Sequence, residues 1–214
     1  MKIVAWDTIL DVGGYSWTPA FARARADVEA AVAEVVWPIG SSDFAIYPES
    51  GKKSGKGNGV VPIKSGFATA IHARGWELEK KAPKATDTED AIIKGSRPGA
   101  FDAHLTFGGD NPLPFVAEWE TGNISSSHRA VNRIFLGIQL GYVSGGVLIL
   151  PSRKLAPFLT DRIGNEPELL PYRPLWSEAR LAPLSYFAMV VIEHDRTSFD
   201  VPRIPKGTDG RAKG

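Results

Sequence analysis

The chain has 214 residues, of which 43% are hydrophobic and 23% are charged, and its formal net charge is +1. This length fits one large domain or two small ones, and the composition is that of an ordinary soluble globular protein. A nearly neutral charge argues against a general nucleic-acid coating protein. The absence of cysteine excludes disulfides, thiolate metal sites and cysteine nucleophiles. No signal-peptide pattern and no membrane-length apolar run is present, so we expect a cytoplasmic protein that contacts no membrane.

The first predicted elements are two helices separated by a loop. Residues 20–36 are rich in alanine and carry apolar residues at helical spacing, which predicts a helix. Residues 49–58 combine three lysines with glycine and serine, a composition typical of a flexible loop. Residues 62–74 fit a second helix, because Pro62 falls in the first turn and Gly75 lies just past the end.

A hairpin and a helix follow in the middle of the chain. A first core strand is predicted at 76–80. A hairpin follows, with alternating apolar residues in its strands at 99–107 and 113–120, and glycine and asparagine in its turn at 108–112. Residues 125–140 predict a helix with three serines as N-caps and one apolar stripe.

The last third of the chain predicts two strands, one helix and a tail. The continuous apolar run 145–150 is typical of a buried central strand, and 186–193 predicts another strand. A short helix is expected within 154–162, beginning near Pro157. Residues 206–214 are polar and rich in glycine, and we expect them to be disordered. This order of elements indicates an α/β fold with helices on both faces of a mixed sheet, in one domain spanning 1–205.

Three carboxylates stand out in the predicted hairpin: Asp102 on its first strand, and Glu118 and Glu120 on its second. Side chains alternate along a strand, so Glu118 and Glu120 should share one face. Carboxylates this close repel one another unless a cation or a proton lies between them. No Lys or Arg occurs from residue 98 to 128. A divalent metal is therefore the expected partner, and oxygen ligands favour a hard ion, Mg²⁺ or Mn²⁺.

An Asp on one strand followed by an acidic pair on the next resembles the PD-(D/E)xK nuclease pattern, here in its Glu-x-Glu form, Glu118-Trp119-Glu120. The order of hairpin, amphipathic helix and buried strand over residues 75–152 is similar to the BamHI/BglII group of type II restriction endonucleases. The resemblance implies a restriction-endonuclease-like fold and Mg²⁺-dependent hydrolysis of double-stranded DNA, with Mn²⁺ able to substitute. It also implies a homodimer acting at a palindromic site, with a GATC-like core.

The resemblance also implies roles for individual residues. Asp102 and Glu118 would ligate the metal, the main-chain carbonyl of Trp119 would add a ligand, and Glu120 would ligate or orient the attacking water. The pattern usually has Lys where Glu120 stands, which leaves one-metal and two-metal mechanisms open. Glu77 and Glu79, expected on one face of the first strand, are candidates for a further acid. His104 is a candidate ligand or proton shuttle, although a hydrogen-bonded structural histidine is the commoner role.

Candidate DNA contacts surround this hairpin. A helix N-terminus attracts anions, so Ser126 and Ser127 could contact phosphate as well as cap the helix. Arg129 and Arg133 fit DNA contact, a dimer interface or a plain exposed face equally well. Other basic residues could read bases or lie over DNA, namely Lys52, Lys53, Lys56, Arg153, Lys154, Arg173 and Arg180.

Three other interpretations of the carboxylates remain. The first is a nuclease fold that binds DNA without cutting it, although such a protein would be expected to have lost its acids. The second is a repair or phage-defence nuclease on the same core. The third is a two-carboxylate glycosidase, but glycosidase acids flank the sugar from separated positions, whereas these three are close in sequence.

Overall fold

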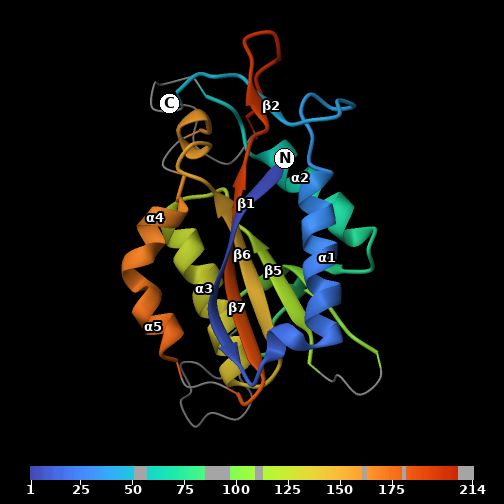
Figure 1. Cartoon of the computed structure of the whole chain (residues 1–214), viewed down its shortest axis with the longest axis vertical. Coiled ribbons are helices and arrows are strands. Elements are labelled where there is room, and N and C mark those ends of the chain that lie inside the picture. The colour runs from blue at the N-terminus through green and yellow to red at the C-terminus, as the bar shows by residue number, and fades with distance from the viewer. Residues whose placement is uncertain (51–56, 85–96, 109–112, 161–162, 180–181, 207–214) are drawn as a thin grey trace.

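The computed structural model describes residues 1–50, 57–84, 97–108, 113–160, 163–179 and 182–206. Its centre is a six-stranded sheet in the order β1-β7-β6-β5-β4-β3 (Figure 1). The strands are β1 (Lys2–Val12), β3 (Glu77–Lys81), β4 (Ala100–Leu105), β5 (Phe115–Trp119), β6 (Gly145–Pro151) and β7 (Ser185–Glu193). The pairs β5–β6 and β6–β7 are parallel, and the other pairs are antiparallel. A small parallel pair joins β2 (Ala45–Ile46) to β8 (Arg196–Thr197).

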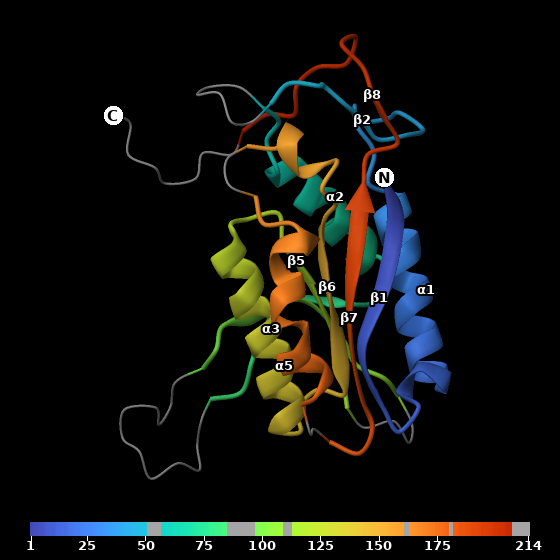
Figure 2. The same ribbon diagram turned by 60° about the vertical axis from the view of Figure 1, so that its left-hand side comes forward.

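Helices cover both faces of the six-stranded sheet (Figures 1 and 2). One face packs on α1 (Pro19–Ala33) and α2 (Val61–His72). The other packs on α3 (Ile124–Gln139), α4 (Glu166–Leu169) and α5 (Arg173–Ser177). Single 3₁₀ turns complete the described part, at η1 (Tyr15–Trp17), η2 (Ala156–Phe158) and η3 (Leu170–Tyr172). This arrangement confirms the predicted mixed α/β sheet with helices on both faces.

The best-predicted elements are those whose side-chain pattern dictates their burial. Every residue of β6 and of β7 is buried, as their continuous apolar sequences predict. On α3 the apolar stripe Val131, Ile134 and Ile138 is fully buried against the sheet, whereas the exposed side is mostly polar but includes Leu136. The predicted helices at 20–36 and 62–74 agree with α1 and α2 to within a few residues.

Several elements depart from the predictions, and β2, α4, η3, α5 and β8 had no predicted counterpart. The edge strand β1 was not predicted, because its mixture of polar and apolar residues becomes a strand only by antiparallel pairing with β7. The helix expected within 154–162 is wrong for the described residues 154–160, which form only the 3₁₀ turn η2; residues 161 and 162 lie outside the described part. Ser152 Oγ accepts hydrogen bonds from the backbone N–H of Lys154 and Leu155, which turns the chain sharply after β6.

Some predictions fall on residues outside the described part of the structure, namely the lysines at 52, 53 and 56, the turn at 109–112, Arg180 and the tail from 207. In the described part, no helix combines the length and the apolar character that a membrane crossing requires.

Candidate active site

The three carboxylates lie where the β4–β5 hairpin is flanked by α2 on one side and α3 on the other. The pairing of β4 with β5 extends as far as Ala103 opposite Ala117. Beyond it, the backbone N–H of Trp119 donates a hydrogen bond of 2.8 Å to Asp102 Oδ2. The carboxylate thus accepts the N–H that a continued ladder would have used, and this contact fixes its orientation.

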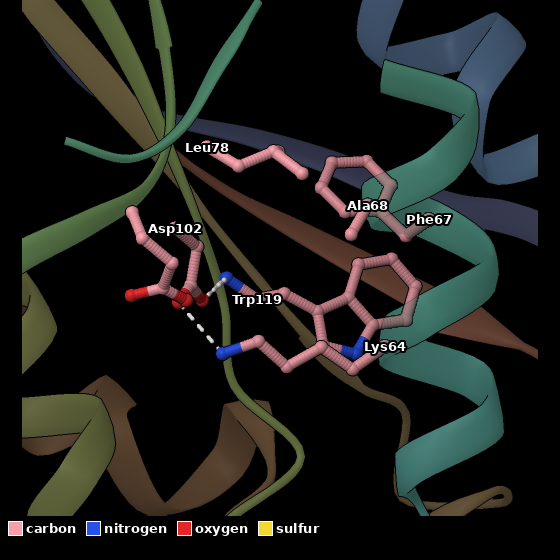
Figure 3. A pocket seen from close by; sticks show the side chains of 7 residues that line it. Lys64, Phe67, Ala68, Leu78, Asp102 and Trp119 are labelled. Carbon is pink, nitrogen blue, oxygen red and sulfur yellow. Dashed lines mark hydrogen bonds and ion pairs between the residues drawn. The ribbon is translucent and has the colours of Figure 1, made fainter. Parts of the chain in front are cut away.

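Asp102 has a second partner that comes from a distant element. Lys64, in the first turn of α2, places its Nζ 2.6 Å from Asp102 Oδ1 (Figure 3). Both oxygens of Asp102 are therefore engaged, one by an ammonium group and one by a main-chain N–H. The two groups border a cavity of about 50 Å³, which Phe67, Leu78 and Trp119 also line.

Glu118 is buried and faces α3. Its side chain is 1% exposed, and its Oε1 lies 2.8 Å from Arg133 Nη1. Arg133 also donates to the carbonyl oxygens of Pro98 and Ala100, so three acceptors hold the guanidinium. Burial raises the pKa of Glu118 to about 8; the charge of Arg133 opposes this shift, and the nearby Asp102 and Glu120 carboxylates add to it.

Glu120 lies just past the end of β5, where its backbone N–H donates to the Ile149 carbonyl oxygen at 2.8 Å. Burial raises the pKa of Glu120 to about 7, and the Asp102 carboxylate raises it further, while Lys64, Arg133 and Arg129 lower it. Basic residues of both flanking helices, Lys64 of α2 and Arg129 and Arg133 of α3, thus act on Glu120. Three acidic groups thus converge on one region with too little positive charge.

The carboxylates have basic partners, although residues 98–128 contain no Lys or Arg. No base is supplied locally, but the fold supplies two: α2 brings Lys64 from 38 residues away, and α3 brings Arg133 from 15 residues beyond Glu118. In the described residues, no three acidic or histidine side chains are arranged to hold a metal as they stand. Asp102 and Glu118 instead each pair with a basic side chain, Lys64 and Arg133 respectively.

Lys64 is the functional candidate that sequence reasoning missed. It is the only charged residue between Val61 and Ile71 on an otherwise apolar helix. A lone lysine in such a helix is a weak signal, and nothing local connects it with Asp102.

Glu77 and Glu79, the two candidates for a further acid, have different surroundings in the structure. Glu77 is exposed and forms an ion pair of 2.7 Å with Lys80. Glu79 adopts the left-handed backbone region at φ 51° and lines the cavity beside Lys64 and Asp102. The predicted shared face was wrong, because the left-handed residue interrupts the alternation of β3. Only Glu79 adjoins the carboxylates.

His104 is 8% exposed, and its Nδ1 has no hydrogen-bond partner among the described residues. Burial lowers its pKa, an effect that Glu77 opposes and Lys80 reinforces. His104 lies opposite Glu77 in the β3–β4 pair, and in the described part of the structure no hydrogen bond or ion pair joins it to Asp102, Glu118 or Glu120.

The N-terminus of α3 differs from the predicted serine caps. The N-cap is Asn123, whose side chain accepts a hydrogen bond from the backbone N–H of Ser126 at 3.1 Å. Arg129 is exposed and donates to Ser126 Oγ at 3.0 Å, so this pair presents polar groups at the helix start. Ser127 is fully buried. Arg133 is held by Glu118 and two main-chain carbonyls.

Among the candidate base readers, Arg173 forms an ion pair of 2.5 Å with Asp7 of β1. Lys154 lies 3.9 Å from Glu193 and is 80% exposed. Neither contact links these residues with the carboxylates.

Comparison of the sequence with known proteins identifies its family. The family model described as "Restriction endonuclease BamHI" matches residues 1–211. The type II restriction enzyme OkrAI of Oceanobacter kriegii is 42% identical over 212 residues, covering 99% of both chains. The type II restriction enzyme BamHI of Bacillus amyloliquefaciens is 31% identical over 193 residues, covering 89% of this chain and 83% of its own.

A solved structure agrees at the level of the fold. The restriction endonuclease BglII, crystallised with a DNA 16-mer, superposes with a TM-score of 0.60 at 11% identity, covering 91% of this chain and 79% of its own. The sheet and its helices therefore have a restriction-endonuclease arrangement. With the match to the family model over nearly the whole chain, these similarities show that the chain belongs to the BamHI family of type II restriction endonucleases.

Proposed function

We propose that this enzyme cuts both strands of double-stranded DNA at a palindromic site with a GATC core, using Mg²⁺ held by Asp102, Glu118 and the main-chain carbonyl of Trp119. The observation that carries the proposal is the convergence of three carboxylates between α2 and α3 in a chain of this family. Mn²⁺ is expected to substitute, because both ions are hard and accept oxygen ligands.

The donor set fits a divalent ion. Every candidate ligand is an oxygen, and the raised pKa values of Glu118 and Glu120, about 8 and about 7, reflect a local shortage of positive charge. A bound Mg²⁺ would lower the pKa of a water molecule and stabilise charge on the scissile phosphate. Lys64 and Arg133 hold Asp102 and Glu118 in the metal-free protein and would have to yield those oxygens.

The remaining residues act through position and protonation. The Trp119 N–H orients Asp102 toward the site. Glu120, with a pKa of about 7, is suited to accept a proton from the attacking water near neutral pH. This role fits the Glu-x-Glu form of the motif, in which a carboxylate stands where a lysine is usual.

Digestion of unmethylated phage DNA tests the proposal. Purified protein is incubated with Mg²⁺ and, in parallel, with EDTA, and the ends of the fragments are sequenced. Discrete fragments that form only with Mg²⁺ support site-specific cleavage and give the site. A smear would point to a repair or defence nuclease, and DNA binding without cleavage would point to a binding protein of nuclease fold.

Arg129 is the exposed residue best placed to contact the DNA backbone. Arg129→Ala should weaken DNA binding and reduce the slope of log K against log salt by about 1, because one phosphate contact is lost. Binding is measured by fluorescence anisotropy at several salt concentrations. Arg25→Ala is the matched control, since Arg25 is equally exposed but lies on α1 and pairs with Glu29. An unchanged slope for Arg129→Ala would place Arg129 away from the phosphates.

A homodimer is the assembly that suits cleavage of two strands, because a two-fold protein matches a palindromic site. The helices α3 and α5 lie on the same face of the sheet (Figure 2). Large apolar side chains on α3, at its C-cap, on η3 and on α5 are exposed, namely Leu136 (37%), Leu140 (64%), Tyr172 (45%) and Leu175 (71%). We assign this face to the second copy, since apolar patches on a soluble protein mark contact surfaces.

Leu175→Asp should convert the dimer to monomer at micromolar concentration, because it places a charge in the apolar contact. The measurement is sedimentation velocity on the DNA-free protein. Ile39→Asp, at an 86% exposed apolar residue in the segment after α1, should leave the dimer intact. A Leu175→Asp protein that remains dimeric would move the interface elsewhere.

A further inference from the structure

Lys64 carries an ammonium group among three carboxylates. Its Nζ contacts Asp102 (Figure 3). Glu79 lines the same small cavity. The ion pair of 2.6 Å between Lys64 and Asp102 makes the ammonium group an internal counter-ion for the site.

The two basic side chains at the site differ in how firmly they are held. Arg133 donates to Glu118 and to two main-chain carbonyls, and its side chain is 16% exposed. Lys64 is 43% exposed, and Asp102 is the one hydrogen-bonded side chain that the described part of the structure gives it. Lysine also has a flexible four-carbon stem. Lys64 can therefore swing away from Asp102 more readily than Arg133 can leave Glu118.

Occupancy of Asp102 by Lys64 conflicts with occupancy by a metal. Both oxygens of Asp102 already have partners, at 2.6 Å and 2.8 Å. A divalent ion placed on either oxygen would lie within a few ångströms of the ammonium group and repel it. A phosphate group offers the ammonium an alternative partner of high charge, because lysine binds phosphate as a point charge.

We propose that Lys64 is a positioning residue that occupies Asp102 in the DNA-free enzyme and keeps divalent metal weakly bound until a DNA phosphate draws the ammonium away. This inference rests on the proposed function, because it takes Asp102 as a metal ligand. It couples metal binding to DNA binding, since each ligand favours the arrangement in which Lys64 has left Asp102. It also gives the Glu-x-Glu site a lysine from α2 instead of from β5.

The test is the affinity of the DNA-free protein for Mn²⁺, measured from the electron paramagnetic resonance signal of the free ion. Lys64→Met removes the charge and keeps most of the apolar stem, and it should bind Mn²⁺ about tenfold more tightly than the wild type. Lys64→Gln should behave in the same way, and circular dichroism checks the fold of both. Lys80→Met is the matched control, because Lys80 pairs with the exposed Glu77 outside the cavity, and it should bind Mn²⁺ as the wild type does.

The double variant Lys64→Met/Asp102→Asn distinguishes the proposed role of Lys64 from the assignment of Asp102 as a metal ligand. It should lose the gain in Mn²⁺ affinity, since the metal then lacks its carboxylate. If Lys64→Met and Lys64→Gln bind Mn²⁺ no better than the wild type, while adding Asp102→Asn weakens their binding, Asp102 is a ligand and the role of Lys64 is overturned. If the gain persists in the double variant, Mn²⁺ is not at Asp102 and the proposed metal site itself fails.

Discussion

Asp102→Asn should lower the rate of DNA cleavage by about a thousandfold or more, because it removes a charged metal ligand from the reaction centre. The asparagine oxygen can still accept the Trp119 N–H, so the β4–β5 hairpin is expected to remain intact. DNA binding should be retained or strengthened, since one negative charge near the phosphates is removed. Single-turnover cleavage at saturating enzyme separates the chemical step from binding.

Glu118→Gln should show a similar loss, because Glu118 is the second proposed ligand. Glu77→Gln is the matched control for both variants: it removes a carboxylate from the neighbouring strand β3, where Glu77 is exposed and paired with Lys80. Cleavage by Asp102→Asn or Glu118→Gln at the wild-type rate would show that the metal site has been assigned to the wrong residues.

Glu120→Gln should abolish most cleavage and stabilise the free protein above neutral pH. The folded pKa of Glu120 is about 7, above its ordinary value of 4.5. The carboxyl therefore contributes stability that is complete below pH 4.5 and is lost as the pH rises toward 7. Glutamine cannot ionise, so the variant escapes this loss. The expected difference above pH 7 is about 2–3 kcal/mol in the free energy of unfolding, and cleavage should fall by about 10²- to 10⁴-fold.

Urea unfolding in EDTA between pH 4 and pH 9 measures the stability difference. Glu118 ionises over an overlapping range, with a pKa of about 8, so the comparison is made between the wild type and the single variant at each pH. Glu29→Gln, on the exposed side of α1, should shift stability little at any pH. Parallel curves for the wild type and Glu120→Gln would mean that the surroundings of Glu120 do not disfavour its charge.

Together the two expected results describe a site in which buried carboxylates repel one another and lower the stability of the free protein. Asp102, Glu118 and Glu120 are placed so close that burial and mutual repulsion raise two of their pKa values. Variants that relieve this repulsion should gain stability and lose activity, a trade-off expected where function needs an unfavourable arrangement. Lys64 and Arg133 reduce the repulsion in the free protein but do not remove it.

The sequence by itself determined the carboxylate hairpin, the helix after it and the buried strands. These features depend on periodicity: a repeat of two predicts that Glu118 and Glu120 share one face, and a repeat of 3.6 produces the apolar stripe of α3. Fully apolar runs then identify the central strands β6 and β7. Such patterns are local, so they can be read without knowing which elements meet.

Only the tertiary structure decided which charges meet. Lys64 reaches Asp102 across 38 residues, and β1 becomes a strand by pairing with a segment near the opposite end of the chain. Ser127 turns inward while Ser126 stays at the surface, and the left-handed backbone at Glu79 separates it from Glu77. These outcomes depend on packing between elements far apart in sequence. Spacing along the chain therefore located the acids, whereas the fold selected their basic partners.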